Sequence, residues 1–150
     1  MRVAYTQRHR VHDAIEAALG ATYTSLDHLL SSSDVVVVSC PLNADSRGLL
    51  SRARIASMKR GAVLVNTSRG ACVDEIAVAD ALREGRLAGA ALDVFAAEPA
   101  VSPEILACER AVLTPHLGSA DVDTREAMAA ICAESVLAVL DGREPRFIVR

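Results

Sequence analysis

Residues 61–70 read Gly-Ala-Val-Leu-Val-Asn-Thr-Ser-Arg-Gly, a short apolar run that leads directly into a polar loop. The apolar part is residues 62–65, and residues 35–38 form a second run made entirely of valine. A strand that is hydrophobic at every position is covered on both faces, as strands in parallel sheets are. These two runs therefore predict a parallel β-sheet with both faces covered.

Short apolar runs alternate with helical segments along the whole chain. Strands are expected at residues 3–5, 21–23, 35–38, 62–65, 90–94, 111–114 and 147–149. Helices are expected at residues 11–19, 25–30, 49–58, 74–83 and 124–140. Because strands alternating with helices indicate βαβ units, the fold class is α/β. We expect a Rossmann-like parallel sheet with flanking helices, followed by a long C-terminal helix.

Composition excludes several classes of function. The chain of 150 residues has room for one sizeable core, and its net charge of −3 with 3% aromatic residues argues against nucleic-acid binding. No run reaches the roughly 18 apolar residues that a membrane span needs, and the first residues lack the features of a signal peptide. The cysteines are scattered without a Cys-x-x-Cys pair, which indicates reduced thiols in a cytoplasmic protein and no metal site.

Polar side chains follow three of the expected strands. Arg69 comes after residues 62–65, Glu98 after residues 90–94, and His116 after residues 111–114. Because the carboxyl ends of parallel strands meet at one edge of a sheet, we expect these three side chains to lie close together.

An arginine, a carboxylate and a histidine suit the reduction of a 2-keto acid. Arg69 offers a planar fork that matches a carboxylate, and His116 is able to exchange a proton near neutral pH. A neighbouring carboxylate such as Glu98 favours the protonated histidine. Taken singly, each has a plainer interpretation: an exposed loop arginine, a solvated turn at Glu98, and a hydrogen-bonded loop histidine.

Four ordered motifs resemble those of the D-isomer-specific 2-hydroxyacid dehydrogenases, and most closely the glyoxylate/hydroxypyruvate reductases among them. They are Ser-Cys-Pro-Leu-Asn at 39–43, the segment 61–70, Ala-Leu-Asp-Val-Phe-Ala-Ala-Glu-Pro at 91–99, and Pro-His-Leu-Gly-Ser-Ala at 115–120. The resemblance implies hydride transfer between NAD(P)H and a small 2-keto or 2-hydroxy acid. It implies that Arg69 binds the substrate carboxylate, that His116 is the acid/base, and that Glu98 pairs with His116.

The same resemblance implies a set of cofactor contacts. Asp93 would lie near the nicotinamide carboxamide, and the cofactor would be lined by Pro41, Leu42, Thr67, Ser68 and the backbone at Gly118. Members of the family usually form homodimers, so a homodimer is expected.

The sequence departs from the family at its start. None of the eight glycines forms the G-x-G-x-x-G turn that binds a dinucleotide pyrophosphate, and residues 1–5 match the strand that follows that turn. The absent strand is central in a sheet of order 3-2-1-4-5-6, so the strands at residues 3–5 and 35–38 are expected to lack their shared neighbour. We therefore expect a C-terminal fragment whose sheet is incomplete and which is inactive by itself.

Cofactor preference is read from the loop after the first strand. A carboxylate there binds the ribose 2′-OH of NAD, but residues 6–10 contain Arg8 and Arg10 and no carboxylate. These arginines predict a 2′-phosphate contact and hence NADP in preference to NAD. The alternative is that they are basic residues on an exposed turn.

The chain is expected to consist of two parts, and two functions other than that of an enzyme stay open. Residues 1–120 are expected to form a partial dinucleotide-binding domain, and residues 121–150 a helix and tail that return to a substrate domain. The helix is apolar over a wide face, which favours dimerisation unless it folds back on the sheet. The alternatives to an enzyme are a non-catalytic nucleotide-binding or assembly module, and a degenerate gene product without activity.

Overall fold

The computed structural model describes residues 1–148, and the chain forms two compact units, Met1–Pro115 and His116–Arg150. The first unit alternates strands and helices in the order β1 (Val3–Tyr5), α1 (Asp13–Leu19), β2 (Ala21–Tyr23), α2 (Leu26–Ser32), β3 (Val35–Val38), α3 (Arg52–Ser57), β4 (Ala62–Asn66), the 3-10 turn η1 (Gly70–Cys72), α4 (Glu75–Arg83), β5 (Leu87–Leu92), α5 (Pro103–Leu106) and β6 (Ala111–Leu113). The second unit contains the long helix α6 (Val122–Leu140). The α/β class and the long C-terminal helix are confirmed. The predicted boundary after residue 120 stays a prediction.

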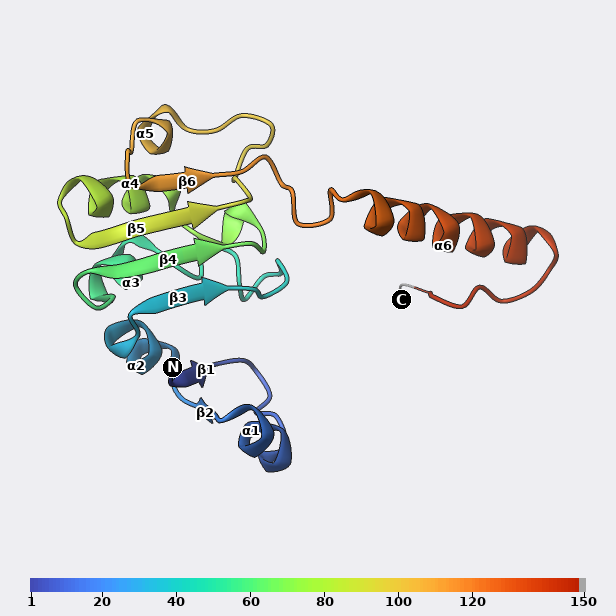
Figure 1. Cartoon of the computed structure of the whole chain (residues 1–150), viewed down its shortest axis with the longest axis horizontal. Coiled ribbons are helices and arrows are strands. Elements are labelled where there is room, and N and C mark those ends of the chain that lie inside the picture. Colours follow the sequence, from blue (N-terminus) through green and yellow to red (C-terminus); the bar gives the residue numbers. More distant parts are fainter. Residues whose placement is uncertain (149–150) are drawn as a thin grey trace. The chain divides into compact units, whose positions relative to one another are not determined.

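The strands of the first unit form two separate parallel sheets (Figure 1). The larger sheet has the order β3-β4-β5-β6, with Val36 opposite Leu64 and Leu64 opposite Ala90. The smaller sheet pairs β1 with β2. Within the described residues β1 and β3 pair with no common strand, as the missing G-x-G-x-x-G segment predicts.

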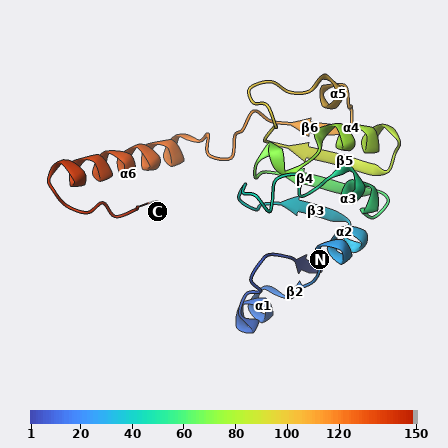
Figure 2. The same cartoon turned by 180° about the vertical axis from the view of Figure 1, so that it is seen from behind.

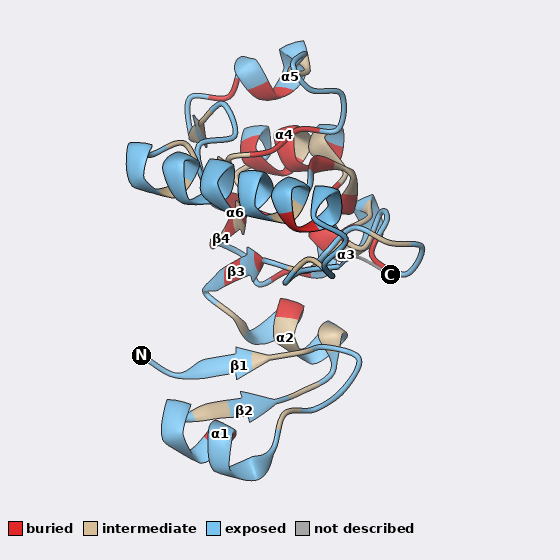
Figure 3. Ribbon diagram, turned by 90° about the vertical axis from the view of Figure 1, so that its right-hand side faces the viewer, coloured by how far each residue is buried: buried red, intermediate tan, exposed pale blue. Residues whose placement is uncertain are grey.

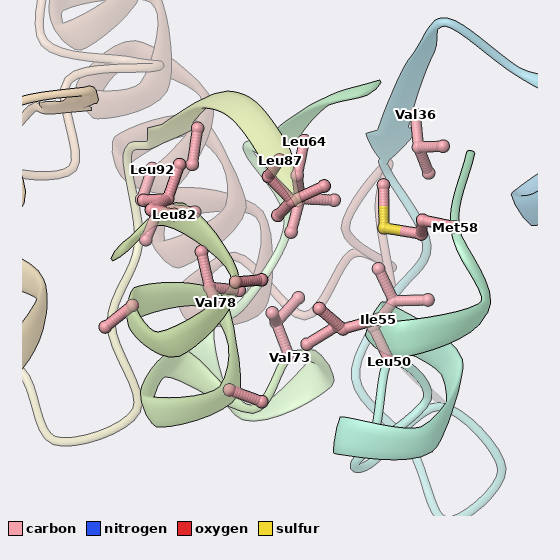
Figure 4. Packing of buried hydrophobic residues seen from close by; sticks show 14 of the residues in the cluster. Val36, Leu50, Ile55, Met58, Leu64, Val73, Val78, Leu82, Leu87 and Leu92 are labelled. Atoms are coloured by element: carbon pink, nitrogen blue, oxygen red, sulfur yellow. The ribbon is translucent and has the colours of Figure 1, made fainter. Parts of the chain in front are cut away.

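Helices cover one face of the larger sheet. Helix α3 packs against α4, α4 against β5, and α5 against β6, and Figure 2 shows this layer from behind. Seven residues of the core beneath them are almost fully buried (Figure 4): Leu50, Ile55, Met58, Leu64, Val78, Leu82 and Leu87. Burial falls away in β1, β2 and α1, which are mostly exposed or half-buried (Figure 3).

The prediction that the all-valine strand is covered on both faces is wrong. Val36 and Val38 of β3 are buried, but Val35 and Val37 are 56% and 58% exposed. The pattern alternates because β3 is the last strand of its sheet and helices cover the sheet on one face. An edge strand half-covered by protein can still be apolar at every position, so its composition did not reveal its exposure.

Two elements have boundaries in the structure that differ from the predicted ones. The helix expected at 49–58 is confined to α3, because Leu50 pairs with the strand-like backbone at Val73 and Ser51 precedes the helix. The strand expected at 90–94 is β5, which begins at Leu87, since its ladder with β4 starts opposite Ala62.

The ends of the other predicted helices and strands of residues 1–140 agree with the prediction or differ from it by one or two residues. Helix α1 begins after its cap His12 and ends at Gly20, whose φ of 59° is the left-handed conformation that glycine adopts without strain. Asp121 caps α6 through the Thr124 amide, so α6 starts two residues early. Phe147 and Ile148 form no strand, and Val149 lies outside the described residues. No helix among residues 1–148 is long and apolar enough to span a membrane.

Candidate active site

Two loops at the carboxyl ends of β3 and β4 enclose a hollow of about 510 Å³. Its lining brings together five of the predicted site residues: Pro41, Leu42, Thr67, Ser68 and Arg69. Ser39 and Cys40 complete it. The volume lies in the range of small-molecule sites, and the lining combines apolar side chains, hydroxyls and a guanidinium.

Asn66, the last residue of β4, holds the loop that carries Arg69. Its buried side chain accepts hydrogen bonds from the Ser68 amide at 3.1 Å and the Ser68 hydroxyl at 2.9 Å, and donates one to the Arg69 carbonyl at 3.1 Å. The Arg69 guanidinium donates to the Ser68 carbonyl at 2.6 Å, while the residue as a whole remains exposed. Asn66 therefore fixes the loop, while Arg69 is exposed to solvent.

Gly70 brings this loop into backbone contact with the loop after β5. A Cβ atom at Gly70 would lie 1.9 Å from the carbonyl carbon of Phe95 and 2.3 Å from the amide nitrogen of Ala96. No side chain fits in that space, so the position requires glycine. The approach joins the Arg69 loop to the segment that leads to Glu98.

The loop after β5 is held by its own carboxylates. Glu98 accepts a hydrogen bond from the Phe95 amide at 2.9 Å, and the Glu98–Pro99 peptide that follows is cis. Asp93 accepts one from the Thr114 hydroxyl at 2.5 Å, which ties the end of β5 to the end of β6. Glu98 is thus part of an ordered turn in the same unit as Arg69, although it is exposed.

His116 is the first residue of the second unit, two residues after Thr114. Its φ of 56° lies in the left-handed region, which costs a residue with a side chain about 1–2 kcal/mol. Strained backbone of this kind clusters at functional sites. Gly118 lies in the same unit, so the meeting of His116 and Gly118 with the residues of the first unit stays a prediction.

The two arginines predicted to read a 2′-phosphate differ in their partners. Arg10 donates to both carboxylate oxygens of Glu16, at 2.8 and 2.7 Å, and this pairing raises the pKa of the guanidinium. Arg8 makes a longer contact, 3.5 Å, with Asp45. Both members of that pair are largely exposed. Arg8 is therefore the arginine better able to turn to a phosphate.

Sequence reasoning missed Cys40 and Glu75. Cys40 lines the hollow beside Pro41, and burial, followed by the neighbouring Cys72 thiol, raises the pKa of its thiol. Glu75, at the start of α4, accepts a hydrogen bond from the Ala96 amide. Only the position of Cys40 inside a recognised motif could have indicated that it lines the hollow. Nothing in the spacing of Glu75 links it to residue 96.

Comparison with known families decides the assignment. A model described as D-isomer specific 2-hydroxyacid dehydrogenase, NAD binding domain, matches residues 1–118. The chain belongs to this dehydrogenase family. It is 42% identical over 149 residues to the glyoxylate reductase of Pyrococcus furiosus, covering 99% of this chain and 44% of that protein. It is also 42% identical over 144 residues to the glyoxylate/hydroxypyruvate reductase B of Erwinia tasmaniensis, covering 95% of this chain and 44% of that protein.

Solved structures of similar proteins have the same fold. The TT0316 protein of Thermus thermophilus matches with a TM-score of 0.91 at 46% identity, over 100% of this chain and 46% of that one. A glyoxylate reductase of Paecilomyes thermophila matches with a TM-score of 0.85 at 37% identity, over 96% of this chain and 44% of that one. The chain therefore spans less than half the length of these relatives.

The hollow fits part of a dinucleotide. Its apolar and hydroxyl-bearing walls suit a ring and a ribose, whereas Arg8 lies outside its lining. The pyrophosphate of a dinucleotide has no matching turn, because the 150 residues contain no G-x-G-x-x-G sequence to bind it.

Proposed function

We propose that this dehydrogenase chain carries the substrate-gripping half of a site that reduces a small 2-keto acid, such as glyoxylate or hydroxypyruvate, with NADPH in the cytoplasm. One observation supports the proposal most strongly. The hollow joins the loops after β3 and β4, and Gly70 packs the Arg69 loop against the segment that leads to Glu98. The names of the relatives favour this substrate class.

Each proposed residue has one task in the reaction. Arg69 binds the substrate carboxylate through paired hydrogen bonds and so turns the keto group toward His116. The imidazolium of His116 donates a proton to the carbonyl oxygen while the carbonyl carbon accepts a hydride, and the carbonyl becomes an alcohol. Glu98 stabilises the imidazolium before that transfer. The bound nicotinamide supplies the hydride.

We also propose what would complete the phosphate site and which surface would form a homodimer. Pyrophosphate binding would need a glycine-rich turn on a strand lying between β1 and β3, whose facing edges have no partner within the described residues. The exposed apolar side chains of α6, among them Met128, Ile131 and Leu137, suit a homodimer contact.

NADPH titration, with NADH in parallel, tests the cofactor part of this proposal. We expect the wild-type chain to bind NADPH more tightly than NADH, because Arg8 would pair with the 2′-phosphate. Arg8→Ala should weaken NADPH binding about tenfold and leave NADH binding unchanged. Arg2→Ala is a matched control, since it removes a guanidinium from the same end of the chain outside the loop. Equal loss of both cofactors in Arg8→Ala would contradict the assignment.

A non-catalytic nucleotide-binding module is the second candidate. The observation that favours it is the missing partner between β1 and β3 within residues 1–148, since a dinucleotide bound without a phosphate turn is poorly oriented for hydride transfer. Turnover of glyoxylate or hydroxypyruvate with NADPH separates the two candidates. Turnover that disappears in His116→Ala supports the enzyme, and saturable binding without turnover supports the module.

A further inference from the structure

The loop that carries Glu98 is held by carboxylates at two consecutive amides. Glu98 itself accepts a hydrogen bond from the Phe95 amide at 2.9 Å. The next amide, that of Ala96, donates to Glu75, the first residue of α4. Both amides therefore donate to a side-chain oxygen, one from the loop itself and one from α4.

The same two residues form the wall against which Gly70 packs. A Cβ at Gly70 would overlap Phe95 and Ala96, so the backbones are in direct contact there. Gly70 directly follows Arg69 and starts the turn η1, and α4 begins three residues after that turn ends. One continuous stretch, residues 69–75, therefore touches the Glu98 loop at both of its ends.

We propose that Glu75 is a positioning residue that fixes the Glu98 loop on the Arg69 loop, so that the two side chains keep one spacing. The importance of that spacing rests on the proposed function, in which Arg69 grips the substrate carboxylate and Glu98 acts on His116. Glu75 touches neither the substrate nor the reacting atoms, and it acts through the Ala96 amide.

A plainer role for Glu75 has to be separated from this one. An acidic residue in the first turn of a helix interacts favourably with the helix dipole, whatever its side chain touches. That role depends on charge and not on reach. The positioning role depends on a side-chain oxygen at residue 75 that reaches the Ala96 amide. A glutamine at this position keeps such an oxygen.

Two substitutions in the full 150-residue chain divide charge from reach. Glu75→Gln keeps an oxygen at the same distance and removes the charge, while Glu75→Asp keeps the charge and shortens the side chain by one methylene. Glu84→Gln is the matched control, because it removes an exposed carboxylate at the other end of α4. The readouts are amide hydrogen exchange at Phe95 and Ala96 and the NMR titration of the Glu98 carboxyl.

We expect Glu75→Asp to speed exchange at Ala96 about tenfold and to shift the Glu98 titration, while amides of β4 keep their protection. Glu75→Gln and Glu84→Gln should resemble wild type at both positions. The inference is overturned if Glu75→Asp leaves Ala96 and Glu98 unchanged, or if Glu75→Gln disturbs them as much as Glu75→Asp does. These readouts need no turnover. If the chain does not reduce a keto acid, the proposed function is refuted. The hydrogen-exchange and titration results still decide whether Glu75 positions the loop.

Discussion

In the larger sheet of the first unit β4 buries Leu64 completely, whereas in the smaller sheet Val3 of β1 is 41% exposed. Both sheets are parallel and both follow the same strand–helix alternation. The larger one is stabilised by a continuous apolar core beneath its helices. The smaller one is built around a polar cluster, in which Glu16 accepts hydrogen bonds from Arg10 and from the Tyr5 hydroxyl. In the smaller sheet, hydrogen bonds and an ion pair take the place of the apolar burial seen in the larger one.

The largest expected effect comes from opening a cavity in the larger sheet. Leu64→Ala removes a fully buried side chain and should lower the free energy of unfolding by about 4 kcal/mol. Val37→Ala truncates a 58%-exposed side chain on the neighbouring strand and should cost less than about 0.5 kcal/mol. Urea denaturation measures both. Similar losses in the two variants would show that the apolar core does not distinguish the two faces of this sheet.

A smaller loss is expected where the two site loops touch. Gly70→Ala would place a Cβ atom against Phe95 and should destabilise the chain by about 3 kcal/mol while weakening NADPH binding. Gly89→Ala is the control, because its Cβ would lie 3.4 Å from the Arg110 carbonyl, an ordinary contact. Thermal unfolding and the cofactor titration together provide the measurement. A Gly70→Ala protein that is as stable as Gly89→Ala would mean that the loops separate without cost.

The smallest effect concerns the polar cluster and depends on pH. Two hydrogen bonds lower the pKa of Glu16 from 4.5 to about 2, and the one from Arg10 has a larger effect than the one from Tyr5. Because the folded-state pKa is the lower one, the ionised carboxylate stabilises the smaller sheet fully above about pH 4.5, and this contribution is lost as the pH falls toward about 2.

Acidification should therefore loosen β1 and β2 before β4 and β5. Amide chemical shifts followed by NMR from about pH 6 to about pH 2 would show the order of loss. In Glu16→Gln the smaller sheet should be loosened already at neutral pH, whereas Glu109→Gln, at an exposed position before β6, should behave like wild type. Simultaneous loss of order in both sheets would contradict the division between them.

The sequence predicted the features that local patterns determine. Apolar runs placed β3 and β4, the polar residues after β4 placed Arg69 in the hollow, and the absence of a glycine-rich turn predicted the break between the sheets. Recognition of the family rested on ordered motifs and is confirmed.

Features that depend on distant neighbours were not predictable. Glu75 and Ala96 are 21 positions apart, and their hydrogen bond depends on tertiary packing that no local pattern reveals. The exposure of Val35 and Val37 depends on which elements lie beside β3, and a valine run is the same whether one face is covered or two. The burial of Glu16 likewise follows from partners that no periodicity reveals.

The aromatic residues add an optical consequence. The chain has two tyrosines and no tryptophan, and Tyr5 and Tyr23 lie in β1 and β2 with their rings 5.4 Å apart in an edge-on arrangement. All tyrosine emission and near-ultraviolet dichroism from tyrosine therefore originate in the smaller sheet. A polypeptide that inserted beside β1 would change this signal, while events confined to the larger sheet would leave it unchanged. The two tyrosines are therefore an intrinsic, label-free spectroscopic reporter of the smaller sheet.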